Sequence, residues 1–269
     1  MRYRMIVLDL DGTLTNRDKV ITPATKAALM EAQERGVKVV LASGRPTCGV
    51  VPLARELELE KYGSYILSFN GGMITDCRTG EAVYEKKLPV SANRQIIALA
   101  REERVSSVLT YEKDKILTTN KDCPYAQLES RINHMELCQT EDLEERVDFA
   151  VPKFLMTDDG DYLAMVEARV KAALGRDFSV YRSDPFFLEV LPKGIDKAQS
   201  LAQLLKTLGM EREEMIACGD GYNDISMIRF AGLGVAMENA VLPARKEADF
   251  ITRSNNDDGV AYVVEKFLL

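Results

Sequence analysis

Apolar runs alternate with amphipathic segments along the first 70 residues of the chain. The runs MIVLDL, VKVVLAS and SYILSF are rich in branched residues, as expected for strands that are covered on both faces. Between them the pattern predicts a helix from about Pro23 to Glu34 and another after Pro46. This order predicts parallel strands that are joined by crossover helices.

The carboxyl-terminal part of the chain returns to the same alternation, and we expect it to complete the same sheet. Its expected elements are a helix over Lys197–Leu208, the run MIACG, a helix over Asn223–Phe230, the run GLGVAM, a short helix near Pro243–Glu247, the run DFIT and a final helix from Gly259 to Phe267.

The middle of the chain has a different pattern. TYEKDKILTTN predicts two strands around a charged turn, and Asp184-Pro185 between FSVYRS and FFLEVL predicts another hairpin. The helices expected here lie at about Ala92–Glu103, Tyr125–Met135 and Tyr162–Leu174. Strands that neighbour one another through hairpins are typical of an antiparallel α+β unit. We therefore predict an α/β protein with a Rossmann-like parallel-sheet core, helices on both faces, from residues 1–84 and 191–269, and an inserted α+β domain at 85–190.

Composition narrows the range of partners. The 269 residues carry a formal net charge of -7, and no run of lysine and arginine offers a track for a nucleic acid backbone, so nucleic acid is not an expected partner. No window reaches the roughly 18 uncharged apolar residues of a spanning helix, and the opening residues lack the pattern of a secretory signal. We expect no membrane association.

The number and spacing of cysteine and histidine residues limit the kinds of catalysis that the chain can perform. The five cysteines are widely spaced and include no C-x-x-C pair, which favours reduced thiols in a cytoplasmic protein. A single histidine, His134, gives no recognisable zinc ligand set. Any catalysis must rest on carboxylates, lysine and hydroxyl groups.

Polar residues follow the predicted strands at their carboxyl ends, the edge where open α/β sheets bind ligands. In VLDLDGT, Asp9 and Asp11 end the first strand, and two close carboxylates out of bulk water favour a divalent cation such as Mg²⁺ between them. The alternative is a helix cap beside a solvated neighbour, although Gly12-Thr13 favours a ligand site.

Three further strand ends add to this picture. Ser43-Gly44 offers a hydroxyl and backbone amides for an anion, or simply caps a helix, and Arg45 faces either the site or the solvent. Lys197 lies in the first turn of a helix, where a cation is electrostatically unfavourable, which suggests that it serves an anion or nearby carboxylates. GDGYND supplies Asp220, Asn223 and Asp224, which are loop and capping residues in the plainer interpretation. Four strand ends that each deliver one part of a single site are an improbable coincidence.

Four segments also match a known family in order and spacing: DLDGT, ASGR, PKGIDKAQSL and GDGYNDISMI-x-x-AGLGVAMENA. On these motifs the chain resembles the haloacid dehalogenase superfamily, in particular its Cof-type branch and the YidA-like sugar phosphatases. The likeness runs essentially end to end, and the inserted domain is its least diagnostic part.

The resemblance implies roles for individual residues. Asp9 would be the nucleophile that forms an aspartyl-phosphate, and Asp11 the general acid and base. Mg²⁺ would be held by Asp9, the backbone carbonyl of Asp11 and Asp220, with Asp224 adjacent or bridged by water. The residues implied to hold the phosphoryl group are Leu10, Ser43, Gly44, Lys197 and Asn223, of which Ser43 and Lys197 would also be catalytic.

The expected function is a Mg²⁺-dependent phosphomonoesterase that acts on small phosphorylated metabolites, above all sugar phosphates, with the inserted domain as a cap over the site. Two alternatives stay open: a phosphotransferase or mutase, and a non-catalytic phosphometabolite-binding protein on the same fold. The sequence leaves the physiological substrate and the oligomeric state open.

Overall fold

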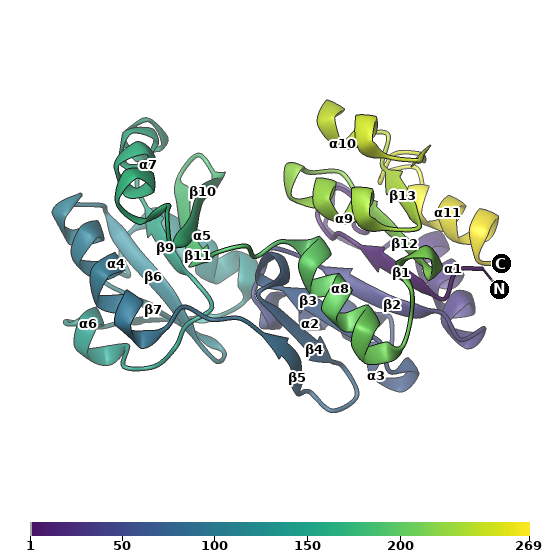
Figure 1. Ribbon diagram of the computed structural model, residues 1–269, viewed down its shortest axis with the longest axis horizontal. Coiled ribbons are helices and arrows are strands. Elements are labelled where there is room, and N and C mark those ends of the chain that lie inside the picture. The colour runs from purple at the N-terminus through teal and green to yellow at the C-terminus, as the bar shows by residue number, and fades with distance from the viewer. Residues whose placement is uncertain (1) are drawn as a thin grey trace. The chain divides into compact units, whose positions relative to one another are not determined.

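The computed structural model describes residues 2–269 as two compact units. The first, here the core unit, joins the chain up to Glu85 to Asp196–Leu269, and the second, here the inserted unit, is Lys86–Ile195 (Figure 1). The second boundary expected from sequence, between residues 190 and 191, falls inside strand β11 (Phe187–Pro192), and the structure places it after Ile195. The strand stays whole because its ladder partners all belong to the inserted unit.

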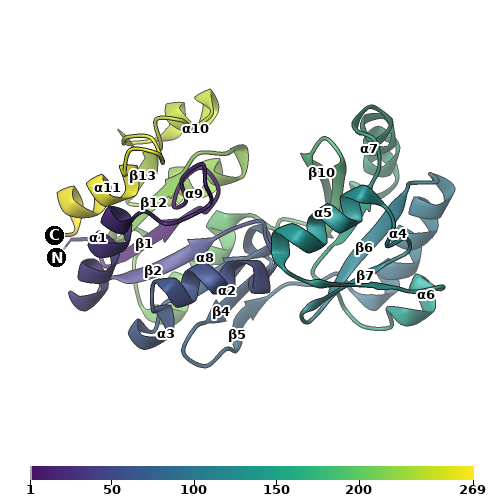
Figure 2. The ribbon, with the colours of Figure 1, turned by 180° about the vertical axis from the view of Figure 1, so that it is seen from behind.

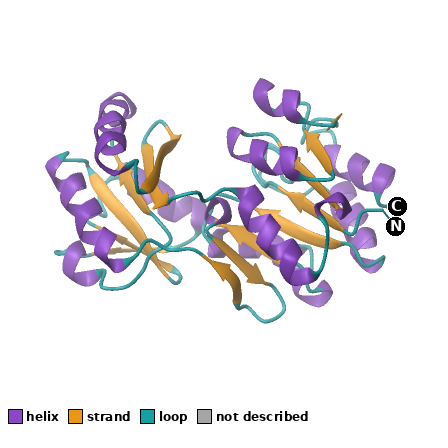
Figure 3. Ribbon diagram, in the orientation of Figure 1, coloured by secondary structure: helices purple, strands orange, loops and turns teal. Residues whose placement is uncertain are grey.

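An eight-stranded sheet forms the centre of the core unit, in the order β14-β13-β12-β1-β2-β3-β4-β5. Pairs from β14 to β3 are parallel, as predicted. The antiparallel strands β4 and β5 were not predicted from the sequence, and they extend the sheet beyond β3 as a meander (Figure 3). The strands are β1 (Met5–Leu8), β2 (Lys38–Ala42), β3 (Tyr65–Ser68), β4 (Met73–Asp76), β5 (Ala82–Glu85), β12 (Met215–Gly219), β13 (Leu233–Ala236) and β14 (Phe250–Ile251).

Helices cover both faces of this sheet, which confirms the predicted Rossmann-like α/β core. Successive residues of β1 alternate between two apolar clusters, with Ile6 and Leu8 in one and Met5 and Val7 in the other. The first cluster includes α1 (Pro23–Glu34), α2 (Thr47–Glu56), α3 (Leu59–Tyr62), α10 (Leu242–Glu247) and α11 (Gly259–Phe267). The second includes α8 (Lys197–Leu208), and Figures 1 and 2 show α8 and α2 on opposite faces.

Capping residues explain where the helices beside the site begin. Asp196 caps α8 by accepting a hydrogen bond from the Gln199 amide at 2.9 Å, so the helix starts at Lys197. The helix expected from Asn223 starts instead as a 3₁₀ turn, η3 (Tyr222–Asp224), and becomes α-helical only in α9 (Ile225–Phe230). Two further 3₁₀ turns are η1 (Phe69–Gly71) and η2 (Arg212–Glu214).

The inserted unit is a six-stranded sheet in the order β10-β11-β9-β6-β7-β8. Its strand pairs are antiparallel except for β7 and β8, which are parallel. The predicted hairpins are β6 (Ser107–Glu112) with β7 (Lys115–Thr118) and β10 (Phe178–Asp184) with β11, whereas β8 (Glu136–Gln139) and β9 (Phe154–Thr157) were not predicted. The helices are α4 (Val90–Glu102), α5 (Pro124–Asn133), α6 (Leu143–Arg146) and α7 (Gly160–Leu174).

One face of this second sheet is packed by α4, α6 and α7 through a shared apolar cluster. Polar side chains are buried elsewhere in the unit. Lys153 Nζ donates to Glu189 Oε1 at 2.9 Å, and both side chains are at most 5% exposed. Among the described residues, Glu189 Oε2 has no hydrogen-bond partner. The Lys153 ammonium group also lies 5.5 Å from the centre of the Tyr111 ring.

Within residues 2–269, none of the helices combines the length and apolar character that crossing a membrane requires.

Candidate active site

The topology brings the ends of three strands, β1, β2 and β12, to one edge of the core sheet. Strand β1 pairs with β2 on one side and β12 on the other, which makes its carboxyl end the point where the strand order reverses. Asp9 follows β1, Ser43 follows β2 and Asp220 follows β12. Asp9 and Ser43 are buried, and the Asp9 amide donates to the Cys218 carbonyl at 3.0 Å.

Lys197 is the buried cation of this edge. Its Nζ donates to Asp9 Oδ1 at 2.6 Å, to Asp224 Oδ1 at 2.6 Å and to the Ala42 carbonyl at 2.9 Å. An ammonium group has three hydrogens, so all of them are used. The position at the start of α8 that looked unfavourable in the sequence is therefore explained by the two carboxylates that the lysine joins.

Three carboxylates gather around this lysine. Oxygen atoms of Asp9, Asp220 and Asp224 lie within 4.8 Å of one another. Asp224 Oδ2 accepts from the amides of Asp220 and Gly221 at 3.0 and 2.8 Å, so both of its oxygens already have donors. Asp9 and Asp220 are thus the better direct ligands for a cation, with Asp224 as their neighbour.

The loop after β1 is fitted closely to Asp220. Thr13 Oγ1 donates to Asp220 Oδ1 at 2.8 Å. Gly12 has a φ of +91°, and a Cβ at this position would stand 2.3 Å from Asp220 Oδ2. Only glycine both adopts this φ readily and has no Cβ to clash with Asp220. The glycine of DLDGT therefore lets the loop backbone approach the acidic cluster.

Burial and the repulsion between carboxylates shift the pKa values of the groups in this cluster. Burial, and then the charge of Asp224, raise the pKa of Asp9 well above its usual value, and Lys197 offsets only part of that rise. Burial also raises the pKa of Asp220 to about 6, although the hydrogen bond from Thr13 opposes it. Burial alone would lower the pKa of Lys197, but Asp224 and Asp9 outweigh it and raise that pKa above the usual lysine value. The lysine therefore stays charged, and a further positive charge nearby would favour the ionised form of Asp9 and Asp220.

The carboxylate of Asp11 lies outside the acidic cluster. Arg45 binds it with two hydrogen bonds, Nε to Oδ2 at 3.0 Å and Nη2 to Oδ1 at 2.7 Å, and Lys19 Nζ donates to Oδ1 at 2.7 Å. Burial would raise the pKa of Asp11, but Lys19 and Arg45 outweigh it and lower that pKa. A metal contact from Asp11 is therefore left to its backbone carbonyl, and Arg45 faces the site rather than solvent alone.

The comparisons with known proteins decide the family. The family model described as haloacid dehalogenase-like hydrolase matches residues 6–264. The chain is a haloacid dehalogenase-like hydrolase. It is similar to a haloacid dehalogenase-like hydrolase of Bacteroides thetaiotaomicron with a solved structure, at 47% identity and a TM-score of 0.94, covering 98% of this chain and 99% of that one.

Two relatives carry more specific descriptions. A 5-amino-6-(5-phospho-D-ribitylamino)uracil phosphatase of Bacillus subtilis is 31% identical over 99% of this chain and 96% of its own. A solved HAD subclass IIB sugar phosphatase shares the fold, at a TM-score of 0.81 and 24% identity, over 98% of both chains. The family and the Bacillus subtilis relative make the hydrolase a phosphatase, and the resemblance to the Cof-type branch is confirmed.

The residues expected to hold a phosphoryl group have distinct settings in the hydrolase. Ser43 Oγ accepts from the Arg45 amide at 3.2 Å, and Gly44 follows it in the same turn. Asn223 is exposed on the η3 turn. The side chain of Leu10 is fully buried in the apolar core, so a phosphate contact there is left to its backbone.

Sequence reasoning missed Lys19 and Asn70. Lys19 lies in a polar loop and gave no signal. Asn70 lies in η1, directly after β3, in the segment SFNGG, where an asparagine before two glycines at a strand end was an available signal. The backbone N–H of Asn70 donates to the Ser43 carbonyl at 2.9 Å.

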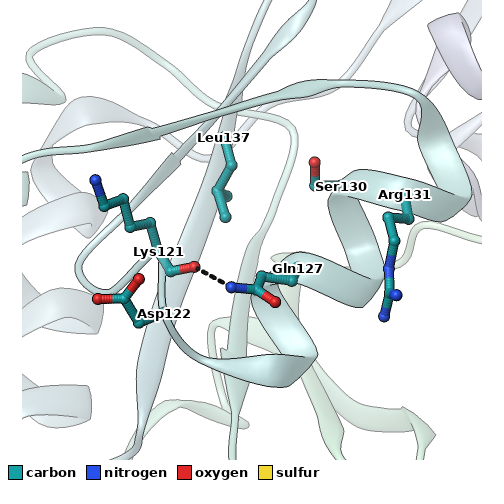
Figure 4. A pocket seen from close by; sticks show the side chains of 6 residues that line it. All are labelled: Lys121, Asp122, Gln127, Ser130, Arg131 and Leu137. Atoms are coloured by element: carbon teal, nitrogen blue, oxygen red, sulfur yellow. Dashed lines mark hydrogen bonds between the residues drawn. The ribbon is translucent and has the colours of Figure 1, made fainter.

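The inserted unit of the hydrolase has a pocket of its own, about 380 Å³ in volume (Figure 4). Its lining residues are Lys121, Asp122, Gln127, Ser130, Arg131 and Leu137, and Gln127 Nε2 donates to the Lys121 carbonyl at 3.2 Å. None of these side chains is buried. The desolvated, mutually repelling groups that mark a catalytic site are found at the strand ends of the core unit instead.

Proposed function

We propose that the protein is a Mg²⁺-dependent phosphomonoesterase that hydrolyses small phosphorylated metabolites, with sugar phosphates as the preferred class. The observation that carries the proposal is the cluster of Asp9, Asp220 and Asp224 around one buried cation, Lys197. When all are ionised, three carboxylates and one ammonium group leave an excess of two negative charges, which a divalent cation would cancel.

The donor set fits Mg²⁺, which prefers oxygen ligands and retains several waters. Asp9 and Asp220 would hold it through carboxylate oxygens, Asp11 through its backbone carbonyl, and Asp224 beside them or through a water. Bound there, Mg²⁺ would supply the positive charge that lets a phosphate dianion approach an anionic nucleophile.

Asp9 is the nucleophile in this proposal. Its carboxylate oxygen forms a bond to phosphorus as the ester P–O bond breaks, which gives an aspartyl-phosphate. The hydrogen bond from Lys197 to Asp9 Oδ1 fixes the rotamer of the side chain, and the same ammonium group offsets the charge that develops on the phosphoryl oxygens.

Asp11 moves the protons. It gives a proton to the departing alkoxide and then takes one from the water that attacks phosphorus and releases inorganic phosphate. Arg45 and Lys19 hold its carboxylate in place and favour its ionised form. Arrival of a phosphate dianion opposes that preference, since a nearby negative charge raises the pKa of a carboxyl group.

The remaining parts of the site serve binding. Ser43, Gly44, Asn223 and the backbone at Leu10 would hold the phosphoryl oxygens. We assign the inserted unit to the selection of the leaving group, as a cap that excludes water during turnover. Within residues 2–269 none of the five cysteines forms a disulfide, and we assign the protein to a reducing, cytoplasmic location.

The substrate class rests on the relatives. The Bacillus subtilis relative is named for a phosphorylated ribityl compound, and the structural relative is described as a sugar phosphatase. Both names refer to phosphate on a polyhydroxylated carbon chain.

The test is a screen of the purified protein with Mg²⁺ against sugar phosphates, nucleotides and pyridoxal phosphate, scored by release of inorganic phosphate. We expect turnover with several sugar phosphates and loss of activity in EDTA. Isomerised product without phosphate release would favour the mutase alternative. Negligible turnover throughout, or a long polyanion as the best substrate, would contradict the proposal.

A further inference from the structure

Asn70 stands at a fourth strand end of the site, at the carboxyl end of β3. It is 8% exposed, although asparagine is a polar residue that is usually found at the surface. It also has a φ of 55° and a ψ of 28°, and the preceding residue, Phe69, has a φ of 53°. Two consecutive non-glycine residues in the left-handed region are costly, and such strain persists only where the surroundings enforce it.

The backbone of this segment holds the turn that follows β2. The backbone N–H of Asn70 donates to the Ser43 carbonyl at 2.9 Å, and the backbone N–H of Phe69 donates to the Arg45 carbonyl at 3.0 Å. These two bonds bracket Gly44, so the orientation of the peptide units around Gly44 depends on the strained turn at the end of β3.

The side chain of Asn70 lies against Gly44. A Cβ at Gly44 would stand 3.1 Å from Asn70 Nδ2 and 3.2 Å from Asn70 Oδ1. A side chain at Gly44 would therefore push the amide group of Asn70 aside by a few tenths of an ångström. The next residue, Gly71, is fixed from the other side, because its carbonyl accepts from Ser200 Oγ at 2.5 Å.

The same side chain reaches the third strand-end loop. Asn223 Nδ2 donates to Asn70 Oδ1 at 3.1 Å. An amide nitrogen has two hydrogens, so donation to Asn70 leaves one for a ligand and fixes the plane in which it points. Asn223 is exposed, and without this partner its side chain would be free to rotate.

We propose that Asn70 is a positioning residue of the phosphate site, which orients Asn223 through its side-chain carbonyl and holds the turn at Gly44 through its backbone. This inference rests on the proposed function and deepens it, since it explains how the loops after β2 and β12 are set to receive one phosphoryl group. Preorganised donors need no rearrangement at the moment of reaction.

The test is a double-mutant cycle of Asn70→Gly and Asn223→Ala. Glycine keeps the left-handed backbone and removes only the amide, so the variant is expected to fold. Each single variant should lose about 10-fold to 100-fold in kcat/KM, and the double variant should be no more than about threefold worse than Asn223→Ala alone. The melting temperature of each variant should equal that of the wild-type protein, because the substitutions change the phosphate site and not the core.

Glu58→Gly is the matched control. Glu58 is exposed, belongs to the core unit and has a φ of 52°, so the substitution repeats the backbone change away from the site. It should leave kcat/KM unchanged. Full activity of Asn70→Gly, or losses that simply add in the double variant, would overturn the inference.

Binding of inorganic phosphate in the presence of Mg²⁺, measured by calorimetry, separates this inference from the proposed function. If the wild-type protein turns over no substrate, the phosphatase proposal fails, but weaker phosphate binding in both single variants without additivity still supports the role of Asn70. Phosphate binding that is absent from the wild type, or equal in all variants, overturns that role.

Discussion

The two units of the molecule each bury a lysine against carboxylates, but the charges are balanced in one unit and not in the other. In the inserted unit, Lys153 meets Glu189 alone, and the pair is neutral. In the core unit, Lys197 meets Asp9 and Asp224, with Asp220 close by. The charges of the Lys153 pair cancel within the protein, whereas the carboxylates around Lys197 leave an excess of negative charge.

The origin of the difference is topological. Lys153 precedes β9 and Glu189 lies within β11, two strands that are paired side by side. The three aspartates of the core unit come from loops at the ends of β1 and β12, where backbone leaves the ladder and can approach a ligand. A buried ion pair inside a sheet contributes to packing, but carboxylates crowded at a strand-end edge store repulsion that a bound cation relieves.

The sharpest test removes a charge beside each lysine. Asp9→Asn should lower kcat/KM by roughly 10⁴-fold or more, because an amide cannot act as the nucleophile. Glu189→Gln, the matched change in the inserted unit, should stay within a few-fold of wild type. Both are measured as phosphate release. Ordinary activity in Asp9→Asn, or an equal loss in Glu189→Gln, would break the comparison.

The next largest effect concerns stability. Lys153→Met leaves Glu189 buried without its cation and should lower the free energy of unfolding by about 3–5 kcal/mol. Urea denaturation followed by circular dichroism measures the change. The double variant Lys153→Met/Glu189→Leu should recover most of the loss, because an apolar pair replaces the neutral ion pair. No recovery would mean that the pair does more than balance charge.

Metal addition should stabilise the core unit in a pH-dependent way. Mg²⁺ at about 100 times its Kd should add roughly 2.7 kcal/mol above pH 7. At pH 5, Asp220, with its pKa of about 6, is mostly protonated, so Mg²⁺ should bind about tenfold more weakly. Thermal unfolding with and without MgCl₂ checks this, and an equal shift at both pH values would argue against Asp220 as a ligand.

The metal-free protein gives the converse result. The pKa of Asp220 rises from 3.8 to about 6 on folding, so the folded state binds more protons between these values. Its contribution to stability is fully present below pH 3.8 and is lost as the pH rises through about 6. Asp220→Asn should lack this trend, which the difference in melting temperature between variant and wild type across the window measures.

The smallest expected effect on kcat/KM comes from removing the hydroxyl group of a buried threonine in each unit. Thr13→Val removes the hydrogen bond to Asp220 and should lower kcat/KM about tenfold, as expected from roughly 1.5 kcal/mol for a bond to a charged group. Thr110→Val removes a bond to the Lys153 carbonyl in the inserted unit and should change stability but not kcat/KM. Equal kinetic losses in both would remove the distinction between the two units.

Local patterns predicted much of the fold. The helices Pro23–Glu34, Lys197–Leu208 and Gly259–Phe267 have the predicted bounds. In the first two, a capping side chain, Thr22 or Asp196, marks the same start as the apolar periodicity. Strands β4, β5, β8 and β9 were missed. Each is a four-residue segment that gives a short local signal, and β9 pairs only with β6 and β11, which are distant from it in the sequence.

The sequence by itself determined the residue types of the site and their placement at strand ends, since apolar runs that end in DLDGT, ASGR and GDGYND are local features. Only the tertiary structure decided which side chains meet: that Lys197 joins Asp9 to Asp224, that Arg45 holds Asp11 apart from the acidic cluster, and that Asn70 links the loops of Gly44 and Asn223. These contacts join residues from different strand ends, and their distances are set by the strand order and twist of the sheet rather than by spacing along the chain.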